Sequence, residues 1–167
     1  MAYFKYFNNI NYDVRGVKNN ANIDVVTNIL KRVRLKVDFL NNRAFFAQIQ
    51  IVDGQTPEYI AYKYYGDSEL HWIVLYAKKA TNPYYDWPLD YFALKKFVDK
   101  KYGADKINDT HHYEDADKYE VDSTASGATA ITNFVYEERL NDNKRNLTII
   151  RPEFVRDVVK ELKQLLK

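Results

Sequence analysis

The side chains best suited to chemistry in this chain are His111, His112 and Glu114, which stand close together in one polar stretch. Imidazole and carboxylate groups are common ligands of zinc and of other transition metals. On a regular strand, however, neighbouring side chains point to opposite faces, so His111 and His112 would not reach the same ion. The sequence therefore favours ordinary polar side chains at this point, and we predict no metal and no other cofactor.

Other catalytic arrangements are also missing from the sequence. The chain has no cysteine, which excludes disulfides, thiol nucleophiles and cysteine-bound zinc. It contains no G-x-S-x-G motif, and its 5 glycines leave little room for a phosphate-binding loop. Glu58, Asp86 and Asp90 lie at turns or helix starts, where acidic residues usually act as caps. We therefore predict no catalytic residues and no enzymatic activity.

Length and charge narrow the classes of partner. A chain of 167 residues suits one domain, or one small domain with ordered extensions. The formal net charge of +2 argues against nucleic acid or an anionic membrane as the main partner. The basic run Lys31–Lys36 is more typical of a solvated face than of a phosphate site. The start of the chain lacks the apolar region of a secretory signal, so we expect synthesis and folding in the cytoplasm.

Local signals predict a strand followed by two helices in the first half of the chain. Residues 45–52 alternate apolar with small or polar side chains, which indicates a half-buried strand. Thr56 and Pro57 provide an N-cap and a first helical residue, and Gly66 provides a stop. Asp67 or Ser68 then caps a second helix that runs to about Lys78.

The second helix has apolar side chains on two faces. Leu70, Ile73, Val74 and Ala77 form the stripe expected to face a core, whereas Trp72, Leu75 and Tyr76 fall on the other side. Burial of this second face requires further contacts, either within the chain or with a partner. The 16% aromatic content fits both alternatives, because tyrosine suits cores and protein interfaces alike.

The remaining segments have weaker or simpler patterns. Residues 1–44 suggest an extended arm with short helical turns, in which a helix starting at Asn22 or Asp24 and a strand further on are both open. After Pro83 the pattern predicts a turn over 81–88, a helix over 89–102, short strands near 111–122, and a flexible connector over 123–130. A helix, the apolar strand 146–150, and an amphipathic helix from Pro152 then complete the chain.

The stretch "DGQTPEYIAYKYYGD", the tryptophan of the second helix and the following "TNP" resemble a LysM module. The resemblance implies a βααβ fold, and in the LysM family such modules bind polymers of N-acetylglucosamine such as peptidoglycan. The matching positions are Gly54, Thr56, Ile60, Ala61, Tyr65, Gly66, Trp72, Asn82 and Pro83.

Longer stretches resemble a more specific family. "TPEYIAYKYYGDSELHWIVLYAKKATNPYYDWPLDYF", "KKYG", "HHYE" and "RLNDNKRNLTIIRPEFVRDVVKELKQLL" are similar to the LysM-containing baseplate wedge protein of contractile-tailed bacteriophages, the wedge subunit 53 family. This resemblance runs from about Ile29 to the C-terminus. It implies a structural virion protein that binds other inner wedge subunits and joins neighbouring wedges around the hub. Candidate interface residues are Trp72, Leu75, Tyr76, Tyr84, Tyr85, Trp87, Phe154, Val158, Leu162 and Leu165.

Together these observations predict an α+β chain with four consecutive segments. They are an N-terminal arm (1–44), a small LysM-like βααβ module (45–90), a helix and connector with short strands (91–131), and a helix-strand-helix assembly segment (132–167). The predicted function is that of a structural component of a phage tail baseplate, located in the virion. The alternative is a LysM-type protein that binds peptidoglycan or N-acetylglucosamine. A secretion signal, tandem modules or an attached hydrolase would favour that alternative, and the sequence shows none of them.

Overall fold

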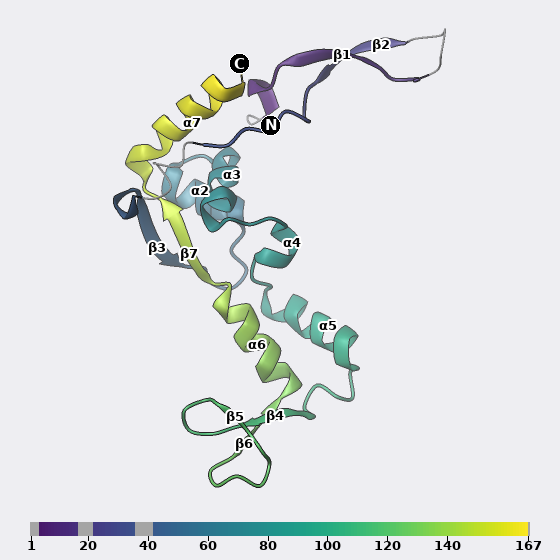
Figure 1. The fold of residues 1–167 in the computed structure, drawn as a ribbon, viewed down its shortest axis with the longest axis vertical. Coiled ribbons are helices and arrows are strands. Elements are labelled where there is room, and N and C mark those ends of the chain that lie inside the picture. The colour runs from purple at the N-terminus through teal and green to yellow at the C-terminus, as the bar shows by residue number, and fades with distance from the viewer. Residues whose placement is uncertain (1–3, 17–21, 36–41, 167) are drawn as a thin grey trace. The chain divides into compact units, whose positions relative to one another are not determined.

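The computed structural model describes residues 4–16, 22–35 and 42–166, and it is a mixed α+β structure as predicted (Figure 1). The chain divides into two compact units. Unit 1 comprises Met1–Ala47, Thr56–Lys79 and Thr148–Lys167, and unit 2 comprises Gln48–Gln55 and Ala80–Leu147. The four predicted segments follow chain order, whereas each unit gathers stretches that are distant in sequence.

The elements of unit 1 are mostly helical. They are η1 (Phe4–Tyr6), β1 (Asn9–Asp13), β2 (Ile23–Thr27), η2 (Arg43–Phe45), α2 (Pro57–Tyr65), η3 (Ser68–Leu70), α3 (His71–Lys78) and α7 (Pro152–Leu166). Unit 2 contains α4 (Pro83–Asp86), α5 (Tyr91–Tyr102), β4 (Thr110–Glu114), β5 (Glu120–Val121), β6 (Thr129–Thr132) and α6 (Asn133–Asn143). The division between the units falls within β3 (Phe46–Gln50) and β7 (Asn146–Ile150).

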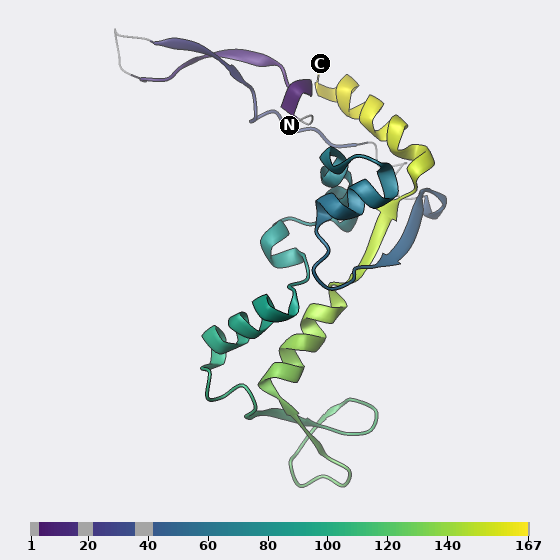
Figure 2. The same ribbon diagram turned by 180° about the vertical axis from the view of Figure 1, so that it is seen from behind.

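Strands β3 and β7 pair with each other across a long stretch of sequence (Figure 2). The Arg151 N–H donates to the Phe45 carbonyl at 2.8 Å, and the Ile51 N–H donates to the Arg145 carbonyl at 2.9 Å. These bonds at the two ends of the ladder make the pair antiparallel. Both strands were predicted, and their mutual pairing was not.

Helix α2 and the second helix follow their predicted boundaries. The Thr56 hydroxyl accepts from the Tyr59 N–H at 3.3 Å, and Gly66 ends α2 with a φ of 75°. A left-handed φ of this kind favours glycine because it has no Cβ. Asp67 caps the second helix, whose first turn is the 3-10 helix η3 and whose remainder is α3.

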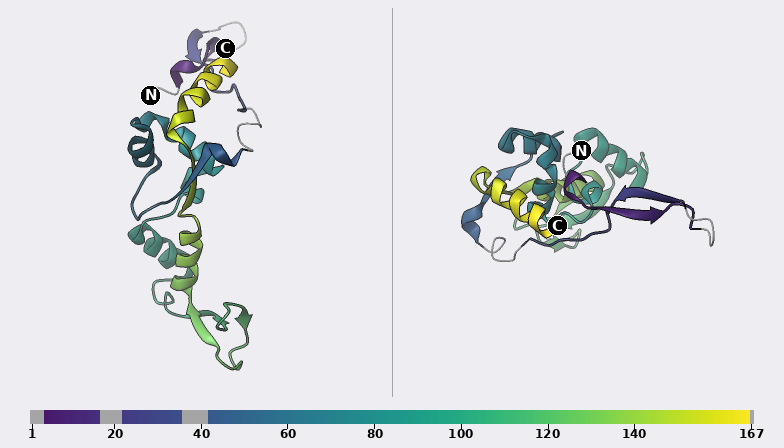
Figure 3. Two further views of the ribbon diagram at one scale, coloured as in Figure 1. Left: turned by 90° about the vertical axis from the view of Figure 1, so that its left-hand side faces the viewer. Right: turned by 90° about the horizontal axis from the view of Figure 1, so that it is seen from above.

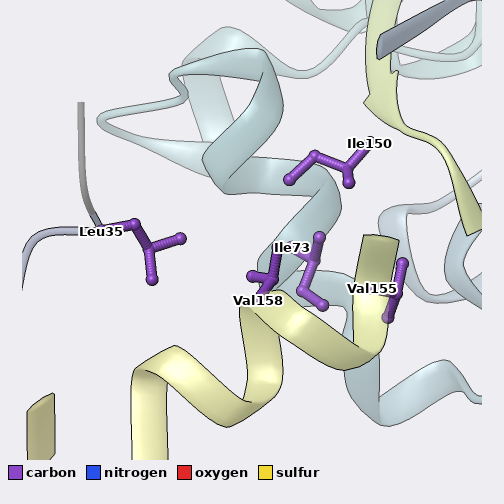
Figure 4. Close-up of a cluster of buried hydrophobic side chains, with 5 residues drawn as sticks. All are labelled: Leu35, Ile73, Ile150, Val155 and Val158. Carbon is purple, nitrogen blue, oxygen red and sulfur yellow. The ribbon is translucent and has the colours of Figure 1, made fainter. Parts of the chain in front are cut away.

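The core of unit 1 joins segments from the whole length of the chain. Leu35, Ile73, Ile150, Val155 and Val158 form one buried cluster, and Figure 4 shows these side chains converging from α3, α7 and the segments around them. The apolar stripe of α7 faces this cluster, which confirms the predicted amphipathic helix.

The basic run contacts the end of α7 in the same unit. The Lys31 ammonium donates to the Leu166 carbonyl at 2.7 Å, where the helix dipole favours a positive charge. Lys31 therefore caps a helix end, while Lys36 lies outside the described residues.

A half-buried tyrosine links α2 to the end of β7. The Tyr65 hydroxyl donates to the Ile150 carbonyl at 2.9 Å, and burial raises the pKa of Tyr65 above its usual range. The hydroxyl therefore stays protonated in the folded protein at alkaline pH, where an unfolded tyrosine ionises.

Replacing Tyr65 with phenylalanine is expected to cost about 1 kcal/mol of unfolding free energy at neutral pH, because the Ile150 carbonyl loses its donor. The raised pKa adds stability that is complete below a pH of about 10 and is lost as pH rises further. The difference in unfolding free energy between the natural protein and the Tyr65→Phe variant should therefore shrink above this pH. Urea unfolding below and above pH 10 measures this difference, and Tyr62→Phe, at an exposed tyrosine, is the control. A difference that does not change with pH would contradict the assignment.

The N-terminal arm contains a hairpin that was not predicted. Strands β1 and β2 are antiparallel, with Asn9 opposite Thr27 and Asp13 opposite Ile23 (Figure 3). The helix considered to start at Asn22 or Asp24 is wrong, because this stretch is the strand β2. The later part of the considered strand falls partly on residues 36–41, which lie outside the described residues.

Unit 2 combines a three-stranded sheet with the helix pair α5 and α6. The strand order is β5-β4-β6, and both pairs are antiparallel. The segment 129–130 belongs to β6, so the predicted connector 123–130 ends in a strand rather than continuing to 130. The predicted helix over 89–102 is α5, with Asp90 as its N-cap.

A buried carboxylate in unit 2 holds its two long helices together. Glu137 of α6 accepts from the Lys101 ammonium at 2.5 Å and from the Tyr102 hydroxyl at 2.8 Å. The hydrogen bond to Glu137 raises the pKa of Lys101, and burial raises that of Tyr102. Both neighbours of Glu137 therefore keep their protons well into the alkaline range.

Within the described residues, no helix is long and apolar enough to cross a membrane.

Candidate interaction surfaces

The predicted turn over 81–88 is built around the single-turn helix α4, which is closed by side-chain caps. The Asn82 side chain accepts from the Tyr84 N–H at 3.1 Å, and Pro83 occupies the first helical position. Asp86 accepts from the backbone N–H groups of Thr81 and Asn82 at 2.8 and 2.9 Å. The turn prediction missed this helix, which is stabilised mainly by these caps.

The aromatic residues of this segment separate into an inward and an outward set. The Trp87 indole N–H donates to the Gln55 carbonyl at 2.8 Å, and Trp87 is half-buried next to the buried Pro88. Tyr84 and Tyr85 are instead 88% and 74% exposed. Trp87 therefore anchors α4 in unit 2, while Tyr84 and Tyr85 extend into solvent.

A groove lies beside this exposed pair. It has a volume of about 550 Å³ and is lined by residues of α4, α5, α6 and the segment before α5, all of them in unit 2. Apolar side chains dominate its lining: Tyr84, Tyr85, Leu89, Ala93, Leu94, Phe97 and Leu140. We call it the unit 2 groove. No sequence signal marked it, because its walls come from separate helices.

The second face of α3 is partly covered within unit 1. Trp72 and Tyr76 are half-buried and pack against the core cluster of Figure 4. Leu75 is also half-buried. The contacts within the chain thus account for much of the apolar surface that the sequence placed on this face.

The apolar face of α7 is also internal. Val158 and Leu162 are buried, and Leu165 packs against the core cluster. The Phe154 ring meets the Phe45 ring edge to face, with 4.4 Å between centroids. Contacts within the chain therefore account for the burial of these side chains.

The residues that match the LysM pattern have structural roles in helix starts, stops and packing. Ile60 and Ala61 are buried in α2, and Asn82 caps α4. Gly54 adopts a φ of 75° in the turn after β3. The set is divided between the units: Thr56, Ile60, Ala61, Tyr65, Gly66 and Trp72 are in unit 1, and Gly54, Asn82 and Pro83 are in unit 2.

The two histidines do not point to opposite faces, because β4 is not regular. A register shift between Thr110 and His112 brings the Nδ1 atoms of His111 and His112 to 2.8 Å. His112 Nε2 lies 2.9 Å from Glu114, and Arg139 donates to both oxygens of that carboxylate at 2.7 and 2.6 Å. The hydrogen bond from Arg139 lowers the pKa of Glu114. The described residues contain no group of three or more potential metal ligands.

Comparison with known proteins links the chain to one family. The family model described as base plate wedge protein 53, of phages, matches residues 2–125. The match therefore includes the N-terminal arm and ends before the C-terminal residues that also carried the resemblance. A search of curated proteins finds no match.

Proposed function

Since this chain belongs to the phage family of base plate wedge protein 53, we propose that it is a structural subunit of the tail baseplate wedge. In this role it is made in the host cytoplasm and enters the virion by binding other wedge subunits. It joins neighbouring wedges around the hub. Its work is assembly rather than catalysis, because the burial of apolar surface between subunits provides the stabilising free energy.

The observation that carries this proposal is the exposed pair Tyr84 and Tyr85 on a fixed support. The caps from Asn82 and Asp86 and the Trp87 anchor hold α4 in place before any partner binds. Tyrosines on a rigid backbone lose little conformational entropy on binding, and they are enriched at the centres of protein interfaces. A preformed aromatic surface of this kind suits a protein partner.

A LysM-like module is part of the proposal. The element order β3, α2, α3 and then β7, with β7 paired to β3, is consistent with a βααβ arrangement that has the segment between α3 and β7 inserted before its closing strand. We infer that this arrangement supports protein contacts. The alternative, binding of N-acetylglucosamine polymers, predicts saturable binding of chitooligosaccharides by the purified chain. Such binding without incorporation into baseplates would overturn the proposed function.

The direct test is quantitative mass spectrometry of purified baseplates from phage that carry the natural chain or a variant. The double change Tyr84→Ser and Tyr85→Ser is expected to leave the isolated chain folded, because both side chains are largely exposed. It should reduce incorporation by about tenfold or more, as expected for loss of two interface tyrosines.

A matched control is Tyr119→Ser, which removes another exposed tyrosine of unit 2 far from α4 in sequence. Incorporation of this variant should equal that of the natural chain. Absence of the natural chain from purified baseplates would refute the function itself. Normal incorporation of the double variant would show that α4 is not part of the interface.

A further inference from the structure

The unit 2 groove has an apolar floor that the described residues do not fill. Leu94 is buried and Ala93 is half-buried at its base, while Phe97 and Leu140 are 42% and 43% exposed at its edges. Its volume of about 550 Å³ is within the usual range for sites that enclose several side chains or a small ligand. An apolar recess of this size next to exposed tyrosines marks an interaction site.

The edge of the groove is positively charged. Lys96 and Lys100 lie one helical turn apart on the exposed side of α5, and both line the groove. Among the described residues, neither takes part in an ion pair. Lys144, the C-cap residue that follows α6, also lines the groove.

Glu137, the acidic residue among the described residues of the lining, does not offset this charge at the rim. Glu137 is buried and is already held by the Lys101 ammonium and the Tyr102 hydroxyl. The groove thus presents apolar surface inside and the ammonium groups of Lys96 and Lys100 at its edge.

From this geometry we propose that the groove binds an apolar segment of another baseplate subunit that carries acidic side chains beside its apolar ones. This inference rests on the proposed function and adds the chemistry of the partner. The apolar side chains of the segment fill the recess between α5 and α6, and its carboxylates meet Lys96 and Lys100. Charge complementarity at an interface rim mainly sets specificity and the association rate, so the apolar floor supplies most of the affinity.

Amine labelling and carbodiimide cross-linking of intact baseplates test the proposal directly. Lys96 and Lys100 should react about tenfold more slowly with an amine reagent in baseplates than in the isolated chain, as expected for groups covered by a partner. Lys106 is exposed in unit 2 and outside the groove lining, so it serves as the internal control. Carbodiimide joins amines to carboxylates in contact, and it should link Lys96 or Lys100 to Asp or Glu of a different subunit.

Charge reversal provides the genetic arm of the test. Lys96→Glu is expected to lower incorporation into baseplates by about tenfold, whereas Lys106→Glu, with the same change in net charge, should not. The Lys96→Glu variant should fold, because a glutamate four residues before Lys100 is favourable on a helix. Thermal unfolding of the isolated variants checks this point.

Three results would overturn the inference while leaving the chain a baseplate subunit. Lys96 and Lys100 could label in baseplates as fast as in the isolated chain. Their cross-links could lead to a second copy of this chain, or to a segment without apolar residues. Absence of the chain from baseplates would instead refute the proposed function, so the two failures are distinguishable.

Discussion

Replacing Ile73 with alanine is expected to lower the unfolding free energy of unit 1 by about 2–5 kcal/mol. Ile73 is 0% exposed and lies in the cluster with Leu35, Ile150, Val155 and Val158. Removal of three carbon atoms loses their burial and leaves a cavity between α3 and α7. Because these partners come from distant parts of the chain, local rearrangement of one helix will not refill the space.

The two tryptophans of the chain make this measurement specific. Trp72 belongs to unit 1 and Trp87 to unit 2, and there are no others. In a Trp87→Phe background, fluorescence during urea unfolding therefore reports unit 1 through Trp72. Val25→Ala in the same background is the control, because Val25 is 69% exposed and should change stability by less than about 0.5 kcal/mol. Equal transition midpoints for Ile73→Ala and the control would contradict the role of Ile73 in the core.

Elements specified by nearby residues were predicted well. Helix α2 has its cap, first-turn proline and terminal glycine within 11 residues, from Thr56 to Gly66. Helix α7 carries its apolar stripe and its opening proline in one continuous stretch. In both cases the physical causes of the helix lie inside the helix or next to it, so the sequence pattern was enough.

Elements that depend on distant residues were not predicted. The pairing of β3 with β7 joins strands separated by the whole segment from α2 to α6, and neither strand alone specifies its partner. The β1–β2 hairpin was missed because no tight Asn-Gly or Asp-Gly turn separates its strands. The register shift in β4 brings His111 and His112 together instead of onto opposite faces, since alternation holds only for a regular strand.

The exposure of the candidate interface residues also depends on distant contacts and was not predicted. "YYDWP" was identified as an unusual aromatic segment, but the sequence did not show which of its side chains are exposed. Trp87 is oriented inward by the Gln55 carbonyl, and Tyr84 and Tyr85 face outward because Asn82 and Asp86 fix the backbone of α4. Exposure of the apolar face of α7 likewise depends on the core it meets. The sequence therefore predicted the chemical type of these side chains, whereas their exposure to solvent depends on the tertiary structure.

The second large loss of unfolding free energy is expected when Asn141, which lines one wall of the unit 2 groove, is replaced. Its side chain accepts from the Leu89 N–H at 2.8 Å and donates to the Leu89 carbonyl at 2.9 Å, and the residue is buried. Asn141→Ala leaves both backbone groups without these partners. At about 1–3 kcal/mol for each of the two backbone groups left unsatisfied, we expect a loss of roughly 2–6 kcal/mol from unit 2.

Fluorescence of Trp87 in a Trp72→Phe background reports the unfolding of unit 2. A second variant, Asn141→Asp, tests the paired contact with Leu89 through its pH dependence. The ionised aspartate still accepts from the Leu89 N–H but places a negative charge against the Leu89 carbonyl, whereas the protonated form can donate to it. Relative to Asn141→Ala at each pH, the aspartate variant should therefore gain stability as the pH falls. Burial raises the pKa of such a carboxyl, so this added stability is present at low pH and is lost as pH rises. If the two variants keep the same stability difference at every pH, the paired contact with Leu89 does not hold the segment before α5 against α6.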